Sequence, residues 1–356
     1  MKSNEKKLFL LLCSFRAPDK KSIEYCLNEG AATSSVLGLL FANRMAGVAY
    51  HVLEKCDLLG KVEREFRNSL RNAATLNERM NRDYFENEKA LASLLETCEV
   101  KYALLKGAYL CHWYPRGCRT SNDVDVLVKT CDISKIAEKL KGAGFRQGHI
   151  RNGHFTPATR NEIVESKMTR GETVPFIKEV GYPFLRYLEV DLNFSLDYKN
   201  GNSELLERML GRTIYRTIDS MRIRTLDSCD FILHLCSHLY KEATTYAWIQ
   251  MKRDMTFYKY CDIYAMIHDL TENQYAELVE RAHENGQEKE LAYCMFGLKS
   301  FWGDVFESFE APYLSKEDLD YIVVPEKKKT YCYNITDFRE RFFEEDRQKF
   351  LQEVSV

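Results

Sequence analysis

The sequence is 356 residues long, more than one hydrophobic core comfortably serves, so two or three subdomains are expected. Hydrophobic residues make up 45% and charged residues 29%, as in an ordinary soluble globular protein. The 51 basic and 53 acidic residues leave a net charge of −2. This balance disfavours a general nucleic-acid binder, which would carry a basic excess.

The twelve cysteines form no C-x-x-C pair and show no zinc-binding spacing, which favours reduced thiols in a cytoplasmic protein. The apolar run Leu8–Phe15 has helical spacing, and the Arg16-Ala17-Pro18 that follows offers no signal-peptide cleavage site, so an amphipathic first helix is expected. No apolar run reaches transmembrane length, and we expect no membrane partner.

Residues 20–97 have apolar side chains at three- and four-residue intervals, a pattern typical of helices. The expected helices cover Ser22–Leu27, Ser35–Leu53 and Val62–Glu96. Charged side chains of the long third helix, such as Glu78 and Asp83, are interpreted mostly as a solvated face. Residues 1–97 are therefore predicted to form an N-terminal helical subdomain.

A short strand is predicted over Tyr102–Leu105, broken at Lys106-Gly107-Ala108 by a turn into a helix. A glycine in a strand-to-helix turn lets the backbone approach a ligand closely, and free amides at the helix start favour phosphate. Lys106 and Arg119 add positive charge nearby. These residues are the candidate phosphate-binding group.

Asp123 and Asp125 flank Val124 at the start of the apolar run that ends at Val128, which predicts a buried strand. Side chains two residues apart on a strand share a face, roughly 7 Å apart, so both carboxylates point the same way. Two negative charges held this close are usually neutralised by a divalent cation, and hard oxygen ligands favour Mg²⁺ or Mn²⁺. A structural acid pair at a strand end is the alternative, and the glycine turn upstream argues against it.

A helix capped by Asp132 and a strand over 145–150 are expected next, followed by a polar, irregular stretch over 151–180 with short strands near His154–Thr159 and Val174–Ile177. The strand Tyr187–Leu196 then alternates between apolar and polar residues. Its polar face offers Asp191 as a third metal ligand, and Glu189 on the same face is the rival.

Three stretches carry a family resemblance: LLKGAYL (104–110), YPRGCRTSNDVDVLV (114–128) and AEKLKGAGF (137–145). They resemble the uncharacterised nucleotidyltransferase family of the DNA polymerase β-like superfamily. The resemblance implies a small mixed sheet backed by helices, with Asp123 and Asp125 as the metal pair and Asp191 as the third acid. Ala108 departs from the serine or glycine of the wider superfamily, and Asn193 stands where many relatives carry histidine.

The last part, 201–356, is predicted to be helical, including its charged and aromatic tail from Glu326. A helix over Asp227–Tyr240 holds two cysteines and two histidines, but its geometry places His234 and His238 on the side opposite the cysteines, so no zinc site is expected. Whether these histidines or Asp262 reach the cleft is left open.

The sequence thus predicts an α+β fold with an N-terminal helical part (1–97), a nucleotidyltransferase core (98–200) and a C-terminal helical part (201–356). The predicted function is metal-dependent transfer of a nucleoside monophosphate from a nucleoside triphosphate, ATP by preference, to a hydroxyl of an undetermined acceptor. Mg²⁺ or Mn²⁺ is the expected cofactor, and the oligomeric state is undetermined. The alternatives are a non-catalytic binding module, such as a toxin–antitoxin partner, and an enzyme that adds nucleotides to tRNA ends.

Overall fold

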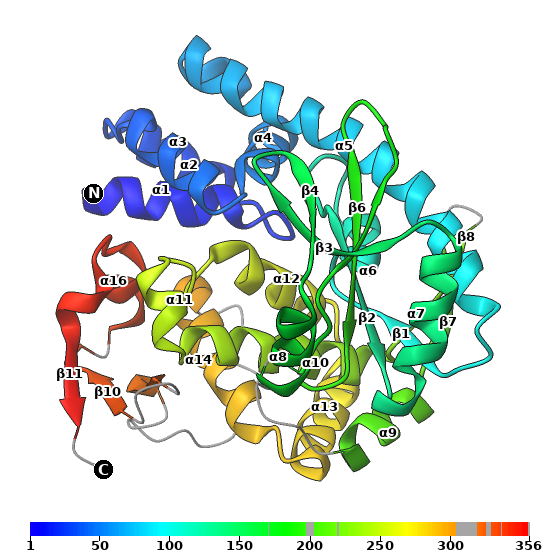
Figure 1. Ribbon diagram of the computed structural model, residues 1–356. Coiled ribbons are helices and arrows are strands. Elements are labelled where there is room, and N and C mark those ends of the chain that lie inside the picture. The colour runs from blue at the N-terminus through cyan, green and yellow to red at the C-terminus, as the bar shows by residue number, and fades with distance from the viewer. Residues whose placement is uncertain are drawn as a thin grey trace. The chain divides into compact units, whose positions relative to one another are not determined.

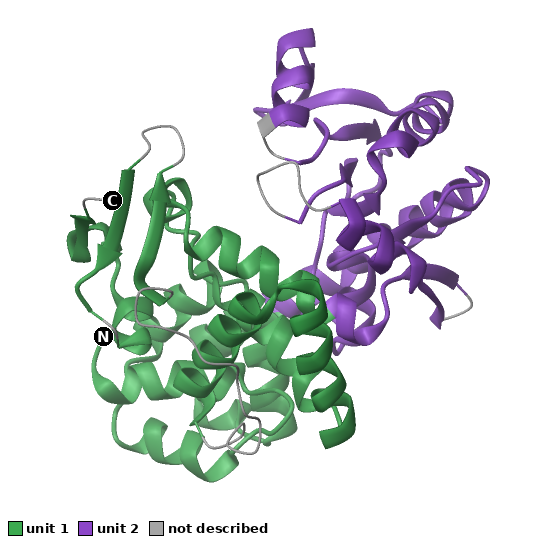
Figure 2. Cartoon of the chain, turned by 90° about the horizontal axis from the view of Figure 1, so that it is seen from below, with its two compact units in different colours: residues 1–71, 232–356 green, residues 72–231 purple. Residues whose placement is uncertain are grey.

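The computed structural model describes residues 1–169, 171–196, 203–218, 221–303, 319–324, 329–335 and 337–354. The chain separates into two compact units, one of residues 1–71 and 232–356 and the other of residues 72–231 (Figure 2). Both points of division lie inside helices, α5 (Arg64–Glu96) and α10 (Ser228–Ala243). The three-part division at residues 97 and 200 stays a prediction.

An eight-stranded sheet runs through the unit of residues 72–231 in the order β4–β3–β5–β6–β2–β1–β8–β7 (Figure 1). β2 pairs in parallel with β6, and β1 with β8, while the other neighbours are antiparallel. The expected mixed sheet is therefore confirmed. Its strands are β1 (Tyr102–Leu104), β2 (Asp123–Val128), β3 (Arg146–Arg151), β4 (His154–Pro157), β5 (Phe176–Glu179), β6 (Tyr187–Asn193), β7 (Ile214–Ile218) and β8 (Met221–Thr225).

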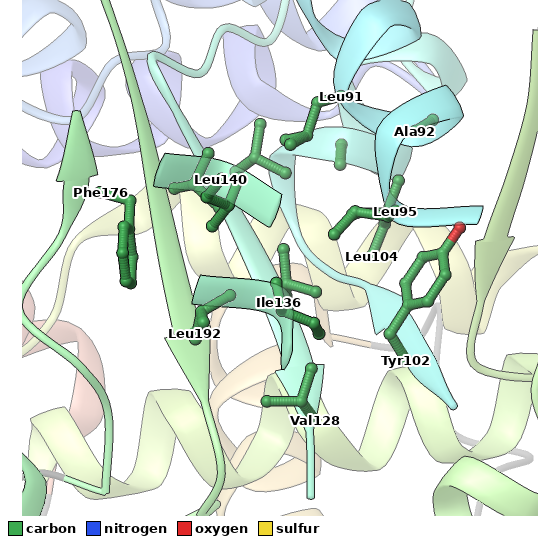
Figure 3. Packing of buried hydrophobic residues seen from close by; sticks show 14 of the residues in the cluster. Leu91, Ala92, Leu95, Tyr102, Leu104, Val128, Ile136, Leu140, Phe176 and Leu192 are labelled. Atoms are coloured by element: carbon green, nitrogen blue, oxygen red, sulfur yellow. The ribbon is translucent and has the colours of Figure 1, made fainter. Parts of the chain in front are cut away.

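The core of this unit lies between one face of the sheet and the helices α5 and α7 (Ile133–Gly142), as Figure 3 shows. Because strand side chains alternate, the valines of β2 enter this core while Asp123 and Asp125 face the other side. Each fully buried valine or leucine contributes about 1.5–3 kcal/mol. The packed side chains include Leu91, Leu95, Leu104, Val128, Ile136, Leu140, Phe176 and Leu192.

The unit also contains α6 (Gly107–Trp113), η2 (Thr130–Asp132), α8 (Arg160–Thr169) and α9 (Ser203–Gly211). The expectation of an irregular stretch over 151–180 is wrong at α8. Its signal is local: the amide of Glu162 bonds the Thr159 hydroxyl at 3.3 Å, and the Glu162 carboxylate accepts from the Thr159 amide at 2.7 Å. This reciprocal capping box starts a helix.

The hairpin of β7 and β8 also lies where only helices were expected. Its alternating burial has the period of two that defines a strand, and β8 attaches through Leu104 and Thr225 to β1. The sheet therefore extends past the predicted end of the core at residue 200.

The other unit consists of helices and a three-stranded sheet, β11–β10–β9. The expected helix over 35–53 is two helices, because Arg44 takes a φ of 57° between them. A single helix over the tail is wrong as well, since β10 there pairs with β9 on one side and with β11 on the other. The elements are α1 (Ser3–Cys13), α2 (Lys20–Asn28), α3 (Thr33–Ala42), α4 (Ala46–Lys55), η1 (Leu59–Lys61), α11 (Tyr246–Gln250), α12 (Phe257–His268), α13 (Glu272–Asn285), α14 (Glu288–Trp302), β9 (Tyr321–Val324), β10 (Lys329–Tyr333), α16 (Phe338–Phe343), η5 (Arg347–Phe350) and β11 (Leu351–Val354).

Within the described ranges, no helix combines the length and the apolar character needed to cross a membrane.

Candidate active site

The parallel pairing of β2 with β6 brings the predicted acids side by side. Asp125 is the register partner of Asp191, and Asp123 is the partner of Glu189. Neighbouring strands lie about 4.8 Å apart, and residues in register present their side chains to the same face. Four carboxylates from two strands therefore share the sheet face opposite the α5–α7 core. We call Asp123, Asp125, Glu189 and Asp191 the acid cluster.

Asp125 is the most enclosed member of the β2 pair, with 7% of its surface exposed. Its Oδ1 accepts a hydrogen bond from Lys106 Nζ at 2.9 Å and another from Asn193 Nδ2 at 3.1 Å. A charge-assisted bond and an amide bond thus converge on one carboxylate oxygen. Both donors fix the orientation of Asp125.

Asp123 has a different environment. Ser121 Oγ donates to its Oδ1 at 2.6 Å, and Tyr84 on α5 donates to its backbone carbonyl at 3.0 Å. The contact of Ser121 was not predicted from the sequence; its only signal is a hydroxyl residue two positions before the acid pair.

The turn before α6 places Lys106 in the cluster. The amide of Leu105 donates to the Asp125 carbonyl at 3.0 Å, so the chain stays paired to β2 up to the turn. Lys106 itself has a φ of 44°, a conformation that costs a non-glycine residue about 1–3 kcal/mol. The turn thereby holds the base of the lysine beside the acid to which its ammonium bonds.

Gly107 is required by close packing. A Cβ at this position would lie 2.3 Å from Ser121 Oγ and 2.4 Å from Ser121 Cβ, far below a normal contact. The sequence pointed to this glycine for its approach to a ligand, whereas the structure brings it against the residue that bonds Asp123.

Ala108 and Arg119 are both engaged within the fold. The Ala108 side chain is fully buried in the core, and its amide donates to the Leu105 carbonyl at 3.2 Å. Arg119 is 8% exposed and donates to the backbone carbonyl of Thr120. The phosphate-binding roles assigned to these two residues stay predictions.

The cluster carries more negative than positive charge. Burial raises the pKa of Asp191 well above its ordinary value, and Asp125, Asp123 and Glu172 add to the rise, while Lys106 opposes it. Burial also raises the pKa of Glu189, with a further contribution from Asp123.

The ammonium of Lys106 responds in the opposite sense. Burial by itself would lower the pKa of Lys106, but attraction to Asp125 and then to Asp123 and Asp191 outweighs it, so the pKa is raised. Lys106 therefore stays charged beside the acids.

Hard carboxylate oxygens are the donors that Mg²⁺ and Mn²⁺ prefer, so the chemistry of the cluster fits a divalent ion. The arrangement is not ready-made: among the described residues, no three Asp, Glu, His or Cys side chains converge as an ion site. One carboxylate of the cluster already contacts a cation, since Lys106 Nζ lies 2.9 Å from Asp125 Oδ1.

One face of α5 holds the segment between the glycine turn and β2. Asn77 Nδ2 donates to the Gly117 carbonyl at 3.0 Å, and Asn81 Nδ2 donates to the Arg119 carbonyl at 2.9 Å. Further along the same face lie Tyr84, which bonds the Asp123 carbonyl, and Glu88, 2.8 Å from His112 Nε2 on α6. We call Asn77, Asn81, Tyr84 and Glu88 the α5 ladder; their spacing places them on a single helix face.

A cavity of about 950 Å³ lies beyond the carboxyl end of β2, where Lys129, Lys141 and Thr173 contribute to its wall. Its described lining does not include the acid cluster, which sits toward the start of β2. The cavity is therefore separate from the candidate site.

His234, His238 and Asp262 belong to the other compact unit.

The sequence from residue 30 to residue 303 matches the model of the uncharacterised nucleotidyltransferase family. The chain belongs to this family.

A search of curated proteins found no match to this family member. Among solved structures, it is similar to an antigenic nucleotidyltransferase-like protein from Paracoccidioides brasiliensis, with 16% sequence identity and a TM-score of 0.32. The match covers 56% of this chain and 88% of that one.

Proposed function

We propose that this protein transfers a nucleoside monophosphate from a nucleoside triphosphate to a hydroxyl group of an acceptor, at the acid cluster. Membership of a nucleotidyltransferase family supports the general reaction. The observation that carries the proposal for this site is the register of β2 on β6, which aligns Asp125 with Asp191 on one sheet face.

We further propose that Asp123, Asp125 and Asp191 hold Mg²⁺ or Mn²⁺, which when bound would neutralise triphosphate charge and make the acceptor hydroxyl more acidic. Glu189 is the rival third ligand. Ser121 and Asn193 orient the two aspartates of β2 through their hydrogen bonds. Lys106 and Arg119, with the backbone at Gly107 and Ala108, are proposed to bind the phosphates, and ATP is the first candidate nucleotide.

The proposal is tested with nucleoside triphosphates that are labelled at the α-phosphate, together with a divalent ion and a cell extract that supplies the acceptor. Mass spectrometry identifies the labelled product. Replacing Asp123 or Asp125 by Asn removes a charge that acts mainly in the transition state, and a loss of about 10²–10³-fold or more in rate is expected. Glu179→Gln, at an exposed acid of β5, is the matched control and should keep full activity. Full activity of a folded Asp123→Asn or Asp125→Asn variant would refute the assignment.

A non-catalytic binding module is the second candidate, favoured by the absence of a ready-made ion site among the described residues. Calorimetric titration with ATP, GTP, CTP and UTP, each with and without Mg²⁺, separates the two. The enzyme should bind at least one nucleotide in a Mg²⁺-dependent manner, whereas a pure protein-binding module should bind none.

A further inference from the structure

Lys106 and Asp125 form an ion pair inside the acid cluster. The nitrogen–oxygen distance is 2.9 Å, and the exposed fractions of the two side chains are 21% and 10%. A partly buried pair of this kind is screened much less by salt than a surface pair. The pair is therefore a substantial element of the charge balance at this face.

The position of the pair matters because the acids around it repel one another. Asp123 and Asp191 both act electrostatically on Lys106, so its single positive charge serves the cluster and not Asp125 alone. Enclosed carboxylates in register would be costly to keep ionised without such a charge. The ammonium of Lys106 therefore neutralises part of the negative charge that a bound metal ion would neutralise.

The ammonium of Lys106 can also move away from Asp125 without a change in the backbone. Its backbone is fixed by the turn, where the Leu105 amide bonds the Asp125 carbonyl. Its ammonium sits at the end of a four-carbon stem and can move by rotation about side-chain bonds alone. A divalent ion bound by the same acids would repel the ammonium and take over its contact with Asp125.

We propose that Lys106 is a built-in cation that neutralises Asp125 while no divalent ion is bound, and that a divalent ion displaces it from that carboxylate. The inference rests on the proposed function only in that the same acids bind the ion. The released ammonium lies within the same site and is then free to bind an anionic group such as a phosphate.

The first test uses the wild-type chain after removal of metal with a chelator. Surface lysines are acylated briefly with an amine-reactive reagent, with and without Mg²⁺, and the modified sites are quantified by mass spectrometry. Mg²⁺ should raise the labelling of Lys106 several-fold by releasing it from Asp125, and should leave the exposed Lys139 on α7 unchanged. Unchanged or reduced labelling of Lys106 at saturating Mg²⁺ would overturn the proposal.

The second test measures Mn²⁺ binding by electron paramagnetic resonance in three variants. Lys106→Met keeps the length of the stem and removes the competing charge, so its Mn²⁺ affinity should rise on the order of tenfold, equivalent to about 1.4 kcal/mol. Lys106→Arg keeps the charge and should stay near the wild-type affinity, as should the control Lys139→Met. No Mn²⁺ binding, or equal affinity in Lys106→Met and wild type, contradicts the proposal.

Neither test contains a nucleotide or an acceptor. Displacement of Lys106 without any nucleotidyl transfer would therefore leave the inference standing and count against the proposed function alone.

Discussion

The two aspartates of β2 are compensated by different groups. Asp123 accepts from a neutral hydroxyl of Ser121, while Asp125 accepts from the charged Lys106. A charged donor forms a stronger hydrogen bond than a neutral one, so the electrostatic balance of the site depends on Lys106 more than on Ser121.

Gly107 offers a test of the packing beneath these contacts. Gly107→Ala forces its new Cβ into Ser121, and a loss of about 1–3 kcal/mol in the free energy of unfolding is expected from overpacking. Urea unfolding measures it. Adding Ser121→Gly should restore part of the stability, because it removes both clashing atoms.

The control for this substitution is Gly142→Ala at the end of α7, where a Cβ meets nothing within 4 Å. It should be neutral or slightly stabilising. A stable Gly107→Ala variant would show that the turn adapts and that the close approach is not required.

Glu88 predicts a pH dependence of stability. Its carboxyl is fully buried, and burial raises its pKa from 4.5 to about 7, against the opposing effect of His112. The folded state thus holds a proton that the unfolded state releases between these values. Stability contributed by this group is complete below pH 4.5 and is lost as the pH rises toward about 7.

Unfolding in urea at pH 5 and pH 8 measures the effect. The wild type should lose a few kcal/mol more over this range than Glu88→Gln, which carries no ionisable group. Glu86→Gln, at an exposed position of the same helix, should follow the wild type. Identical pH dependence in wild type and Glu88→Gln would contradict the raised pKa.

At the scale of elements, α5 has two functions. Its apolar residues pack on the sheet, and Asn77, Asn81 and Tyr84 of its ladder donate to the backbone carbonyls of Gly117, Arg119 and Asp123. Residues 117–122, which lead into β2, lie outside the strands of the sheet. Side chains of α5 therefore supply hydrogen-bond donors to carbonyls of this segment. Buried carbonyl groups need such donors.

Tyr84→Phe tests the ladder by deleting one hydroxyl. The Asp123 carbonyl loses its donor, and a cost of about 1–3 kcal/mol in stability is expected for the unsatisfied group. Nucleotidyl transfer should fall as well, because the start of β2 is less firmly placed.

Tyr215→Phe is the matched control, since its hydroxyl bonds Glu96 at an exposed position and should contribute well under 1 kcal/mol. Equal losses of stability in both variants would mean that the α5 ladder has no special role.

At the scale of the whole molecule, the thiols report on packing. Cys131 is exposed, Cys332 is partly exposed, and the other ten cysteines are buried. Burial also raises the pKa of Cys13, Cys261 and Cys294, which further reduces their reactivity. The native protein should therefore expose one fast-reacting thiol.

Reaction with a chromogenic disulfide reagent checks this. One thiol should react rapidly in native protein, Cys131→Ser should abolish that phase, and all twelve thiols should react in denaturant without reductant. A lower total would reveal a disulfide. The cytoplasmic location, which the reduced thiols suggested, remains a prediction, as does the poor fit to nucleic-acid partners drawn from the charge balance.

Local sequence patterns predicted much of the unit of residues 72–231. Alternation along 123–128 and 187–193 placed the acids on one face of each strand, and the glycine turn identified the junction of β1 with α6. The polar composition of 151–180 does not indicate the helix α8, whose signal is the short capping box of Thr159 and Glu162. The β7–β8 hairpin was not predicted, because the region after residue 200 was expected to be helical and the strands are only five residues long each.

The sequence by itself determined the family, through the motifs of residues 104–145, and the mixed sheet that this resemblance implies. It also determined which side of each strand carries acids, because strand side chains alternate with a period of two residues. Only the tertiary structure decided that Asp125 pairs in register with Asp191, that Lys106 bonds Asp125, and that α5 holds the entry to β2. Register and ion pairing join residues far apart in the chain, and their free energy depends on distances that no local pattern encodes.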